Sequence, residues 1–294
     1  MVLRPKARVL APVDGAPRLT AAACEVLRQA EVLDEYGELR TLDLPAERPL
    51  TLILDGAALV TLMTLGAAPE FLVLGYLFNQ RLIAGVTEIG SIDVDWDTGA
   101  AQVRTRAGAP SSPARRTHTA GCGLGTVLGS MDQLDAIRLP AAGAARLAQR
   151  GLYALLEIMS QQESLHRSAG SVHGCALFRG VELVAFVEDV ARHNAIDTLT
   201  GWMAFHGVGG ADKILYTTGR LSGEMVIKAA QIGVPILVSR NGVTAMGLDV
   251  ARRLGMTLVG RAVKRRFFCY AGSDRFDSEP EPPGLRFATP PRAP

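Results

Sequence analysis

The feature that most constrains the fold is a regular alternation of apolar and amphipathic segments between residues 214 and 263. We expect three strands and two helices here, in the order strand 214–218, helix 222–231, strand 235–239, helix 244–254 and strand 257–263. The strands are apolar at almost every position, which is typical of a sheet covered by helices on both faces. The alternation therefore predicts an α/β sandwich.

Capping residues support this division. Ser222 and Thr244 stand directly before the two expected helices, where a hydroxyl accepts a hydrogen bond from a free backbone N–H group. Gly233 and Gly255 stand after them, where glycine adopts the left-handed conformation at little cost. The preceding stretch extends the pattern with helix 141–160, strands 172–178 and 181–188, and helix 194–205. We therefore assign residues 141–272 to one α/β domain.

Residues 38–117 show a different pattern, in which strands come in pairs. Two hairpins are expected, 50–54 with 57–63 and 89–96 with 101–106. The first turns at Asp55-Gly56, a dipeptide typical of a two-residue hairpin loop. Pro69 suits the first turn of a helix, which we expect to reach residue 78. This region is therefore expected to be a small α+β domain.

The remaining segments are expected to be less ordered. Residues 1–37 begin with a run rich in Pro and Ala and are taken as weakly ordered, with room for a short helix at 21–30. Residues 118–140 form a loop and connector that contains a cysteine. Residues 273–294 carry six prolines and are expected to be disordered.

Charge and cysteine content exclude several classes of protein. The net charge of +2 gives no overall field for nucleic acid, so anion binding would need a local patch. No apolar run is long enough to cross a membrane, and the start of the chain lacks the apolar core of a secretory signal. Cys24, Cys122, Cys175 and Cys269 lie far apart, with no pair at metal-ligand spacing. We expect a reduced, cytoplasmic protein that binds neither nucleic acid nor membrane.

Cys122 is flanked by glycines in the run Gly121-Cys122-Gly123-Leu124-Gly125. Such neighbours leave a thiol accessible and the backbone free to turn, which suits a cysteine used for its reactivity. Cys175 and Cys269 stand among apolar residues and are interpreted as buried hydrophobes. On these residues alone, an incidental free thiol is the alternative for Cys122.

Two polar clusters stand where a strand ends and a helix begins, the usual ligand position in open α/β sheets. Segment 188–197 combines carboxylates, an arginine and a histidine, which suit binding or acid–base chemistry. Turn 217–224 combines a helix N-terminus with an arginine, which suits the binding of an anion. A helix cap with surface salt bridges explains the first cluster equally well, and a well-capped connection between strand and helix explains the second. The charged residues concerned are Asp189, Arg192, His193 and Arg220.

A basic run follows at the end of the last strand, and consists of Arg261, Ala262, Val263, Lys264, Arg265 and Arg266. Four cations in six residues suit a phosphate or pyrophosphate, since arginine makes bidentate contacts with phosphate oxygens. A solvated charged turn is the alternative. A zinc site of the deaminase type is not expected, because His173-Gly174-Cys175 lacks the required Glu and no Pro-Cys-x-x-Cys occurs.

The order and spacing of several motifs between residues 45 and 271 resemble the formate dehydrogenase accessory sulfurtransferase family, also called the FdhD/NarQ family. These motifs are Glu47-Arg48-Pro49-Leu50, Gly75-Tyr76-Leu77, Gly121-Cys122-Gly123, His173 with Ala176, segment 188–197, segment 219–228 (which ends at Lys228) and Leu258-Val259-Gly260.

The resemblance implies a cytoplasmic homodimer with a cytidine-deaminase-like three-layer α/β/α domain, without zinc, beside a smaller N-terminal α+β domain. It implies transfer of persulfide sulfur from a cysteine desulfurase to the molybdenum bis(molybdopterin guanine dinucleotide) cofactor, which formate dehydrogenase or a related molybdoenzyme requires. Under this resemblance Cys122 carries the persulfide. Residues 261–266 would bind the cofactor as a transient substrate, with guanine nucleotides as partial mimics.

The sequence departs from the family pattern at a few positions. Gly125 stands where the family usually has a second cysteine, so one thiol would serve both steps of a sulfur relay. Ala191 replaces a glycine and Thr198 a lysine. A protein that binds and inserts the cofactor without carrying sulfur is therefore the alternative function.

Overall fold

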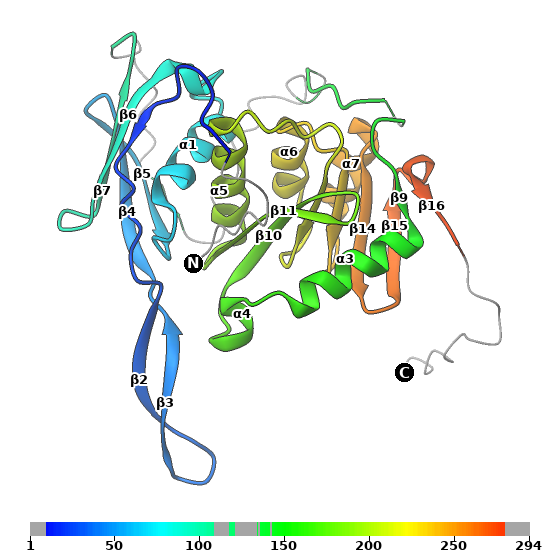
Figure 1. The fold of residues 1–294 in the computed structure, drawn as a ribbon, viewed down its shortest axis with the longest axis horizontal. Coiled ribbons are helices and arrows are strands. Elements are labelled where there is room, and N and C mark those ends of the chain that lie inside the picture. Colours follow the sequence, from blue (N-terminus) through cyan, green and yellow to red (C-terminus); the bar gives the residue numbers. More distant parts are fainter. Residues whose placement is uncertain (1–9, 109–117, 121–133, 135, 142, 280–294) are drawn as a thin grey trace.

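Two mixed six-stranded sheets dominate the part of the chain that the computed structural model describes, which is residues 10–108, 118–120, 134, 136–141 and 143–279. Figure 1 shows the two sheets side by side, with helices α1 and α5 between them. The first sheet has the order β1-β6-β7-β4-β5-β8, and the second has the order β11-β10-β12-β13-β14-β15.

The first sheet contains both hairpins expected from the sequence. Its strands are β1 (Arg18–Leu19), β4 (Arg48–Leu54), β5 (Ala57–Thr64), β6 (Ile89–Asp95), β7 (Ala100–Thr105) and β8 (His118–Ala120). Helix α1 (Pro69–Asn79) begins at the proline and packs its leucines against one face of the sheet. A short 3₁₀ turn, η1 (Val86–Glu88), leads into β6.

The second sheet carries helices on both faces, as its apolar strands predict. Its strands are β10 (His173–Arg179), β11 (Glu182–Asp189), β12 (Ile214–Thr217), β13 (Ile236–Ser239), β14 (Thr257–Val263) and β15 (Arg266–Ala271). One face packs against α5 (Arg192–Phe205), α6 (Gly223–Gln231) and α7 (Ala245–Leu254), and the other against α3 (Gln149–Gln161). Strands β12, β13 and β14 are parallel to one another. A single turn, α4 (Leu165–Ser168), leads from α3 towards β10.

The caps of α6 and α7 follow the sequence closely. The Thr244 hydroxyl accepts a hydrogen bond from the Gly247 N–H at 3.1 Å, whereas Ser222 occupies the N-cap position without such a bond. Gly233 and Gly255 have φ angles of 76° and 64°, in the left-handed region that favours glycine.

Helices α1 and α5 cross at two glycines, and this contact joins the two sheets. A Cβ atom on Gly75 would lie 1.7 Å from the Asp197 carbonyl oxygen, and one on Gly201 would lie 2.0 Å from the Phe71 carbonyl oxygen. Since only hydrogen fits at either position, the backbones approach closely. Beside the crossing, the Asn79 side chain of α1 donates hydrogen bonds to Asp197 Oδ1 (2.6 Å) and Thr200 Oγ1 (3.1 Å) of α5.

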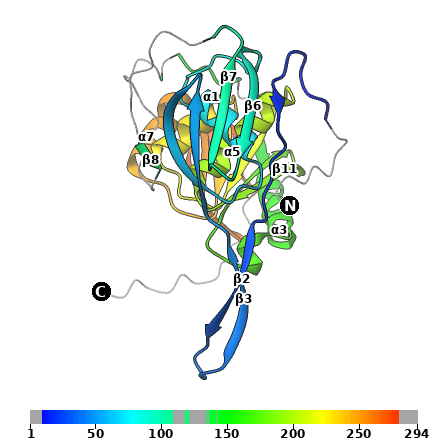
Figure 2. The same ribbon diagram turned by 90° about the vertical axis from the view of Figure 1, so that its left-hand side faces the viewer.

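The helix expected at 21–30 is wrong, because residues Leu27–Leu33 form strand β2. This strand pairs with β3 (Leu39–Pro45) in an antiparallel ribbon, which we call the arm and which projects from the body in Figure 2. The Asp34 carboxylate accepts hydrogen bonds from the backbone N–H groups of Tyr36 and Glu38 and so closes the turn. Asp34 and Gly37 thus set a hairpin turn that lets residues 27–33 pair with β3 as a strand instead of forming a helix.

The disorder expected from residue 273 is also wrong for residues 273–279. A 3₁₀ turn, η2 (Ser273–Arg275), precedes β16 (Phe276–Asp277), which pairs with β9 (Leu147–Ala148). Arg146 forms an ion pair with Asp277, and Phe276 packs against the α3 face of the sheet. Because β9 occupies residues 147–148, α3 begins at Gln149 rather than at residue 141. Among the described residues, no helix has the length and apolar character needed to cross a membrane.

Candidate functional site

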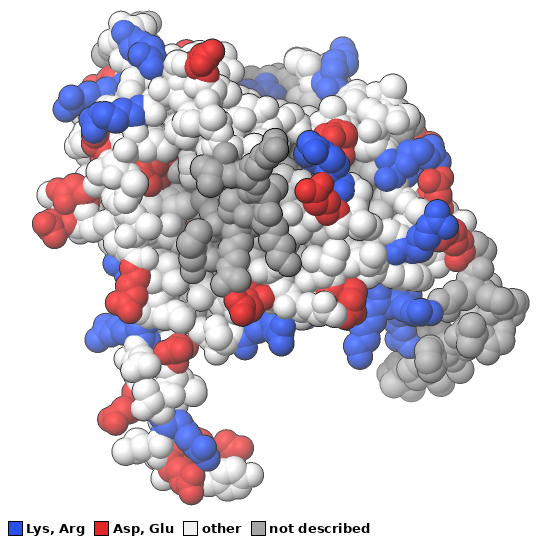
Figure 3. All heavy atoms as spheres, in the orientation of Figure 1, with Lys and Arg blue, Asp and Glu red and all other residues white. Residues whose placement is uncertain are grey.

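The candidate site is the carboxyl edge of the second sheet, which we define as the edge where β12, β13 and β14 end. It is the lower edge of this sheet in Figure 1. Each of these parallel strands has an exposed arginine at or near its end: Arg220 and Arg240 follow β12 and β13, and Arg261 lies within β14, two residues before its end. Figure 3 shows blue side chains gathered at the lower end of β14 and β15. Ligands of open α/β sheets favour such an edge, and its charge here suits an anion.

Hydrogen bonds between the strand-end loops hold this edge in a fixed shape. The Ser239 hydroxyl donates to the Gly219 carbonyl at 2.6 Å and accepts from the Asn241 N–H at 2.9 Å. The Leu221 N–H donates to the Gly242 carbonyl, and the Arg261 N–H donates to the Asn241 carbonyl, at 2.9 and 2.8 Å. These hydrogen bonds therefore fix the backbone at, or directly next to, each of the three arginines.

The predicted cofactor segment, residues 261–266, forms the turn between β14 and β15. Arg261 and Lys264 have positive φ angles of 51° and 56°, which fits the register shift between Gly260 and Val263. The four cationic residues and Val263 are exposed, and the guanidinium of Arg265 lies 5.7 Å from the ring centroid of Tyr153. Ala262 is buried against the α3 face, so its side chain is out of reach of a ligand.

Arg192 and His193 begin α5 at the same edge. A Cβ atom on Gly219 would lie 2.8 Å from Arg192 Cβ, so this glycine lets the arginine lie over the loop after β12. His193 Nε2 lies 3.3 Å from Glu224 Oε2 of α6. Burial, together with the nearby cations Lys228 and Arg192, lowers the pKa of His193 to about 3, so the imidazole is neutral at pH 7.

His173 lies close to this pair, at the start of β10. Its Nδ1 is 3.3 Å from the Thr218 hydroxyl. Burial lowers the pKa of His173, and Arg192 adds to this effect. The buried atoms Arg192 Nε, His193 Nε2 and Ser222 Oγ have no hydrogen-bond partner among the described residues. Because the lowered pKa values favour neutral histidines, the positive charge of this part of the edge comes from its arginines.

A buried ion pair lies behind the edge, between α5 and α6. Lys228 Nζ lies 2.8 Å from Asp197 Oδ2 and 3.5 Å from Glu224 Oε1, and the lysine side chain is 2% exposed. Burial raises the pKa of Tyr76 to about 12, with the charges of Asp197 and Glu224 as further causes. This network ties α1, α5 and α6 together and supports the edge from within.

Asp189, which the sequence offered as a site residue, instead joins the two sheets. Its Oδ2 accepts a hydrogen bond from the Thr64 hydroxyl of β5 at 2.6 Å, and its Oδ1 accepts one from Asn194 at 3.0 Å. Burial raises its pKa to about 6, against these hydrogen bonds. Glu188 accepts the N–H groups of Leu165 and His166 at the start of α4. Glu188 therefore caps the start of α4, whereas Asp189 has a buried structural role that the sequence did not suggest.

The cysteines differ sharply in setting. Cys175 is fully buried, and burial raises its thiol pKa to about 12. Cys269 is partly buried, which also raises its thiol pKa. Cys122 and Gly125 lie outside the described residues. In the described part of the chain, no three His, Cys, Asp or Glu side chains gather in a way that could hold a metal ion.

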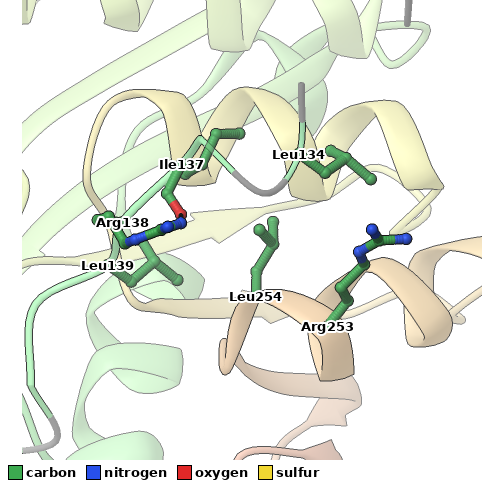
Figure 4. Close-up of a pocket in the computed structure, with 6 residues that line it drawn as sticks. All are labelled: Leu134, Ile137, Arg138, Leu139, Arg253 and Leu254. Atoms are coloured by element: carbon green, nitrogen blue, oxygen red, sulfur yellow. Dashed lines mark hydrogen bonds between the residues drawn. The ribbon is translucent and has the colours of Figure 1, made fainter. Parts of the chain in front are cut away.

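A cavity of about 420 Å³ lies elsewhere, at the end of α7 (Figure 4). Since α7 runs back from the carboxyl edge, this cavity lies at the opposite edge of the sheet. None of the predicted site residues lines it; its lining residues are Leu134, Ile137, Arg138, Leu139, Arg253 and Leu254.

Comparison with known proteins decides the family. A sequence model described as the FdhD/NarQ family matches residues 45–277, which is most of the chain. The chain belongs to the FdhD/NarQ family. The match includes Cys122, the basic run and every strand and helix that borders the carboxyl edge.

Curated relatives of this family agree in name. A "Sulfur carrier protein FdhD" from Anaeromyxobacter dehalogenans is 30% identical over 88% of this chain and 96% of its own. Proteins of the same name from Chromobacterium violaceum and Geobacillus kaustophilus are 31% and 29% identical, over 76% and 79% of this chain and 86% and 89% of theirs. The crystal structure of a putative formate dehydrogenase accessory protein from Desulfotalea psychrophila matches with a TM-score of 0.68 and 25% identity, over 85% of this chain and 98% of that one.

Sequence reasoning missed several residues of this edge. Arg240 and Asn241 directly follow β13, and they carry no spacing pattern that marks them. Their position after a buried strand was the available signal. Gly75, by contrast, belongs to a family motif, and the structure explains it as the crossing point of α1 and α5.

Proposed function

We propose that this protein is a sulfur carrier and sulfurtransferase. It would pass persulfide sulfur from a cysteine desulfurase to the molybdenum bis(molybdopterin guanine dinucleotide) cofactor that formate dehydrogenase needs. Membership of the FdhD/NarQ family supports the proposal, as do the names of the relatives, which are sulfur carrier proteins and a formate dehydrogenase accessory protein.

One observation carries the proposal, namely the position of β8 relative to the carboxyl edge. β8 ends at Ala120, two residues before Cys122, so their Cα atoms lie at most about 7 Å apart. Ala120 pairs with Leu62 of β5, and Thr64 at the end of β5 bonds to Asp189 at the carboxyl edge. Ala120, the last described residue before Cys122, thus lies on a strand beside β5, whose end bonds to β11, and we propose that the thiol acts on this side of the edge.

The proposed chemistry begins with the Cys122 thiolate. It attacks the outer sulfur of the donor persulfide, a new S–S bond forms at Cys122, and the desulfurase cysteine leaves as a thiolate. The terminal sulfur then passes to the metal of the cofactor, which is the substrate and supplies the two electrons that convert sulfane sulfur to a sulfido ligand. Cleavage of the S–S bond returns Cys122 to the thiolate. With Gly125 in place of a second cysteine, one thiol performs both steps.

The cofactor would be held by its phosphates at the basic turn. Arg261, Lys264, Arg265 and Arg266 are exposed there, and arginine and lysine are suited to phosphate oxygens. Ala262 and Val263 would contribute through their backbone. We further propose that the protein works as a cytoplasmic homodimer, with the desulfurase and formate dehydrogenase or a related molybdoenzyme as transient partners.

The persulfide role is tested by mass spectrometry after incubation with a cysteine desulfurase and cysteine. Wild-type protein and Cys24→Ala should gain about 32 Da on Cys122, whereas Cys122→Ala should gain nothing. In cells, Cys122→Ala should abolish formate dehydrogenase activity. A wild-type protein that supports this activity without ever carrying sulfur on Cys122 would rule the role out.

The replacement at Gly125 favours one competing function, a non-catalytic chaperone that binds the cofactor and inserts it. Cys122→Ala separates the two, because a chaperone would still mature the enzyme without the thiol. Loss of maturation with nucleotide binding intact supports sulfur transfer.

The basic turn is tested by charge reversal. Arg265→Glu combined with Arg266→Glu should weaken GDP binding, measured by calorimetry at low salt, because two phosphate-binding cations become anions. Arg252→Glu with Arg253→Glu is a matched control, since this adjacent exposed pair lies at the far end of α7. Equal GDP affinity in the wild type and the 265/266 variant would contradict the assignment.

A further inference from the structure

An exposed aromatic side chain stands beside the basic turn. Phe268 of β15 is 57% exposed, although its neighbour Phe267 packs into the α3 face of the sheet. Across the strand pair, Phe268 faces Gly260 of β14. Because glycine has no side chain, no side chain at position 260 covers the Phe268 ring.

The surroundings of Gly260 are apolar and aromatic. A Cβ atom at this position would lie 2.8 Å from Val243 Cγ2 and 2.9 Å from Tyr270 Cε2, so both side chains lie over the glycine backbone. The rings of Phe268 and Tyr270 meet edge to face, with centroids 6.1 Å apart. We call Val243, Phe268 and Tyr270 the aromatic patch. Tyr270 also packs against the core under α5–α7, which fixes the patch in place.

The patch adjoins groups suited to an anion. Arg261 follows Gly260 directly, and its N–H donates to the Asn241 carbonyl, two residues before Val243. The N-terminus of α7 begins just beyond Val243, at Thr244. An exposed aromatic ring next to cations and a helix N-terminus fits a nucleotide, which joins a stacking base to a charged phosphate group.

We propose that the aromatic patch binds the guanine base of the cofactor, with Phe268 as the stacking surface. This inference rests on the proposed binding of the cofactor phosphates at residues 261–266. It assigns the base to residues outside that run and gives the glycine of the Leu258-Val259-Gly260 motif a role. A larger residue at 260 would displace Tyr270 and Val243 from the patch.

The test compares GDP with inorganic pyrophosphate, which has the phosphates without the base. Phe268→Ala should weaken GDP binding about 5- to 100-fold in calorimetry, the effect of losing one base–aromatic stack, and leave pyrophosphate affinity unchanged. Phe268→Trp should retain GDP binding, because indole also stacks. Tyr36→Ala removes another exposed aromatic residue, at the tip of the arm, and serves as the control.

Three outcomes would overturn the inference. The first is that Phe268→Ala binds GDP as tightly as the wild type and the Tyr36→Ala control do. If Arg265→Glu with Arg266→Glu still weakens GDP binding in that case, the proposed phosphate site stands and the base site alone fails. The second is an equal loss of affinity for GDP and pyrophosphate. The third is that Phe268→Ala sediments as a monomer where the wild type sediments as a dimer, while its GDP affinity is unchanged. Phe268 would then be a contact between subunits.

Discussion

The crossing of α1 and α5 gives the sharpest stability prediction. In Gly75→Ala the new Cβ atom would lie 1.7 Å from the Asp197 carbonyl oxygen, so the helices must separate by roughly 2 Å to restore ordinary contact. Overpacking of this kind costs about 1–3 kcal/mol. Separation also stretches the buried hydrogen bonds from Asn79 to Asp197 and Thr200, which adds about 1–3 kcal/mol.

Higher helix propensity offsets part of this cost, since alanine is favoured over glycine by about 1 kcal/mol. The net expectation is a loss of about 3 kcal/mol in the free energy of unfolding, measured by urea denaturation followed by circular dichroism. Gly151→Ala is the matched control. It lies within α3, and its Cβ atom would meet Leu147 Cδ1 at 3.7 Å, an ordinary contact, so it should gain stability by about 1 kcal/mol. If Gly75→Ala is as stable as Gly151→Ala, the close approach of the helices is refuted.

Three further predictions follow from the same region and from the arm. Lys228→Ala should cost about 3–5 kcal/mol in urea unfolding, because it leaves the Asp197 carboxylate buried without its partner, and Lys228→Met with Asp197→Asn should recover part of this loss. The pKa of His193 is lowered to about 3, below its unfolded value of about 6.5, so its contribution to stability is complete above pH 6.5 and is lost as pH falls towards 3. At pH 5 the loss is about 2 kcal/mol, and His193→Gln should show a correspondingly flatter pH profile of unfolding than the wild type. Replacement of residues 28–44 by a short Gly-Ser turn should change the free energy of unfolding by less than about 1 kcal/mol, because Leu33, Tyr36 and Leu39 are largely exposed; a larger loss would show that the arm supports the body.

The α/β half of the molecule was predictable because burial on both faces leaves a strong pattern. Strands β12 and β13 are buried at every position, and β14 is buried except at Arg261 and Val263, so their sequences are nearly continuous apolar runs. The helices between them end at Gly233 and Gly255, whose φ angles require glycine. Local chemistry and tertiary packing agree at these positions, which makes sequence reasoning reliable there.

The errors arose where burial gives no such pattern. The arm is exposed on both faces, so its strand character rests on cross-strand pairing and on one turn that Asp34 closes. Residues 273–279 are ordered by contacts with residues far away in sequence, such as the ion pair of Asp277 with Arg146. The role of Asp189 stayed open in the sequence because a polar residue at a strand end fits both a ligand site and a structural contact, and its partner Thr64 lies 125 positions away.

The layout of the carboxyl edge fits a long substrate better than a compact one. The basic turn follows β14, whereas Ala120, the last described residue before Cys122, pairs with β5, whose end bonds to Asp189 of β11, four strand spacings away in the sheet order. At about 4.8 Å for each spacing, roughly 19 Å separates the two positions. A nucleotide such as GDP cannot span that distance while its phosphates stay on the turn. In a bis(guanine dinucleotide) cofactor, however, the metal lies near the middle and the guanines at the ends. Binding of one guanine end at β14 and β15 would therefore direct the metal towards β11, the side from which Cys122 would approach it. Under the proposed function, a substrate of this shape would need separate positions for the thiol and the phosphate site, and a single thiol would suffice if the cofactor stayed bound while the donor came and went.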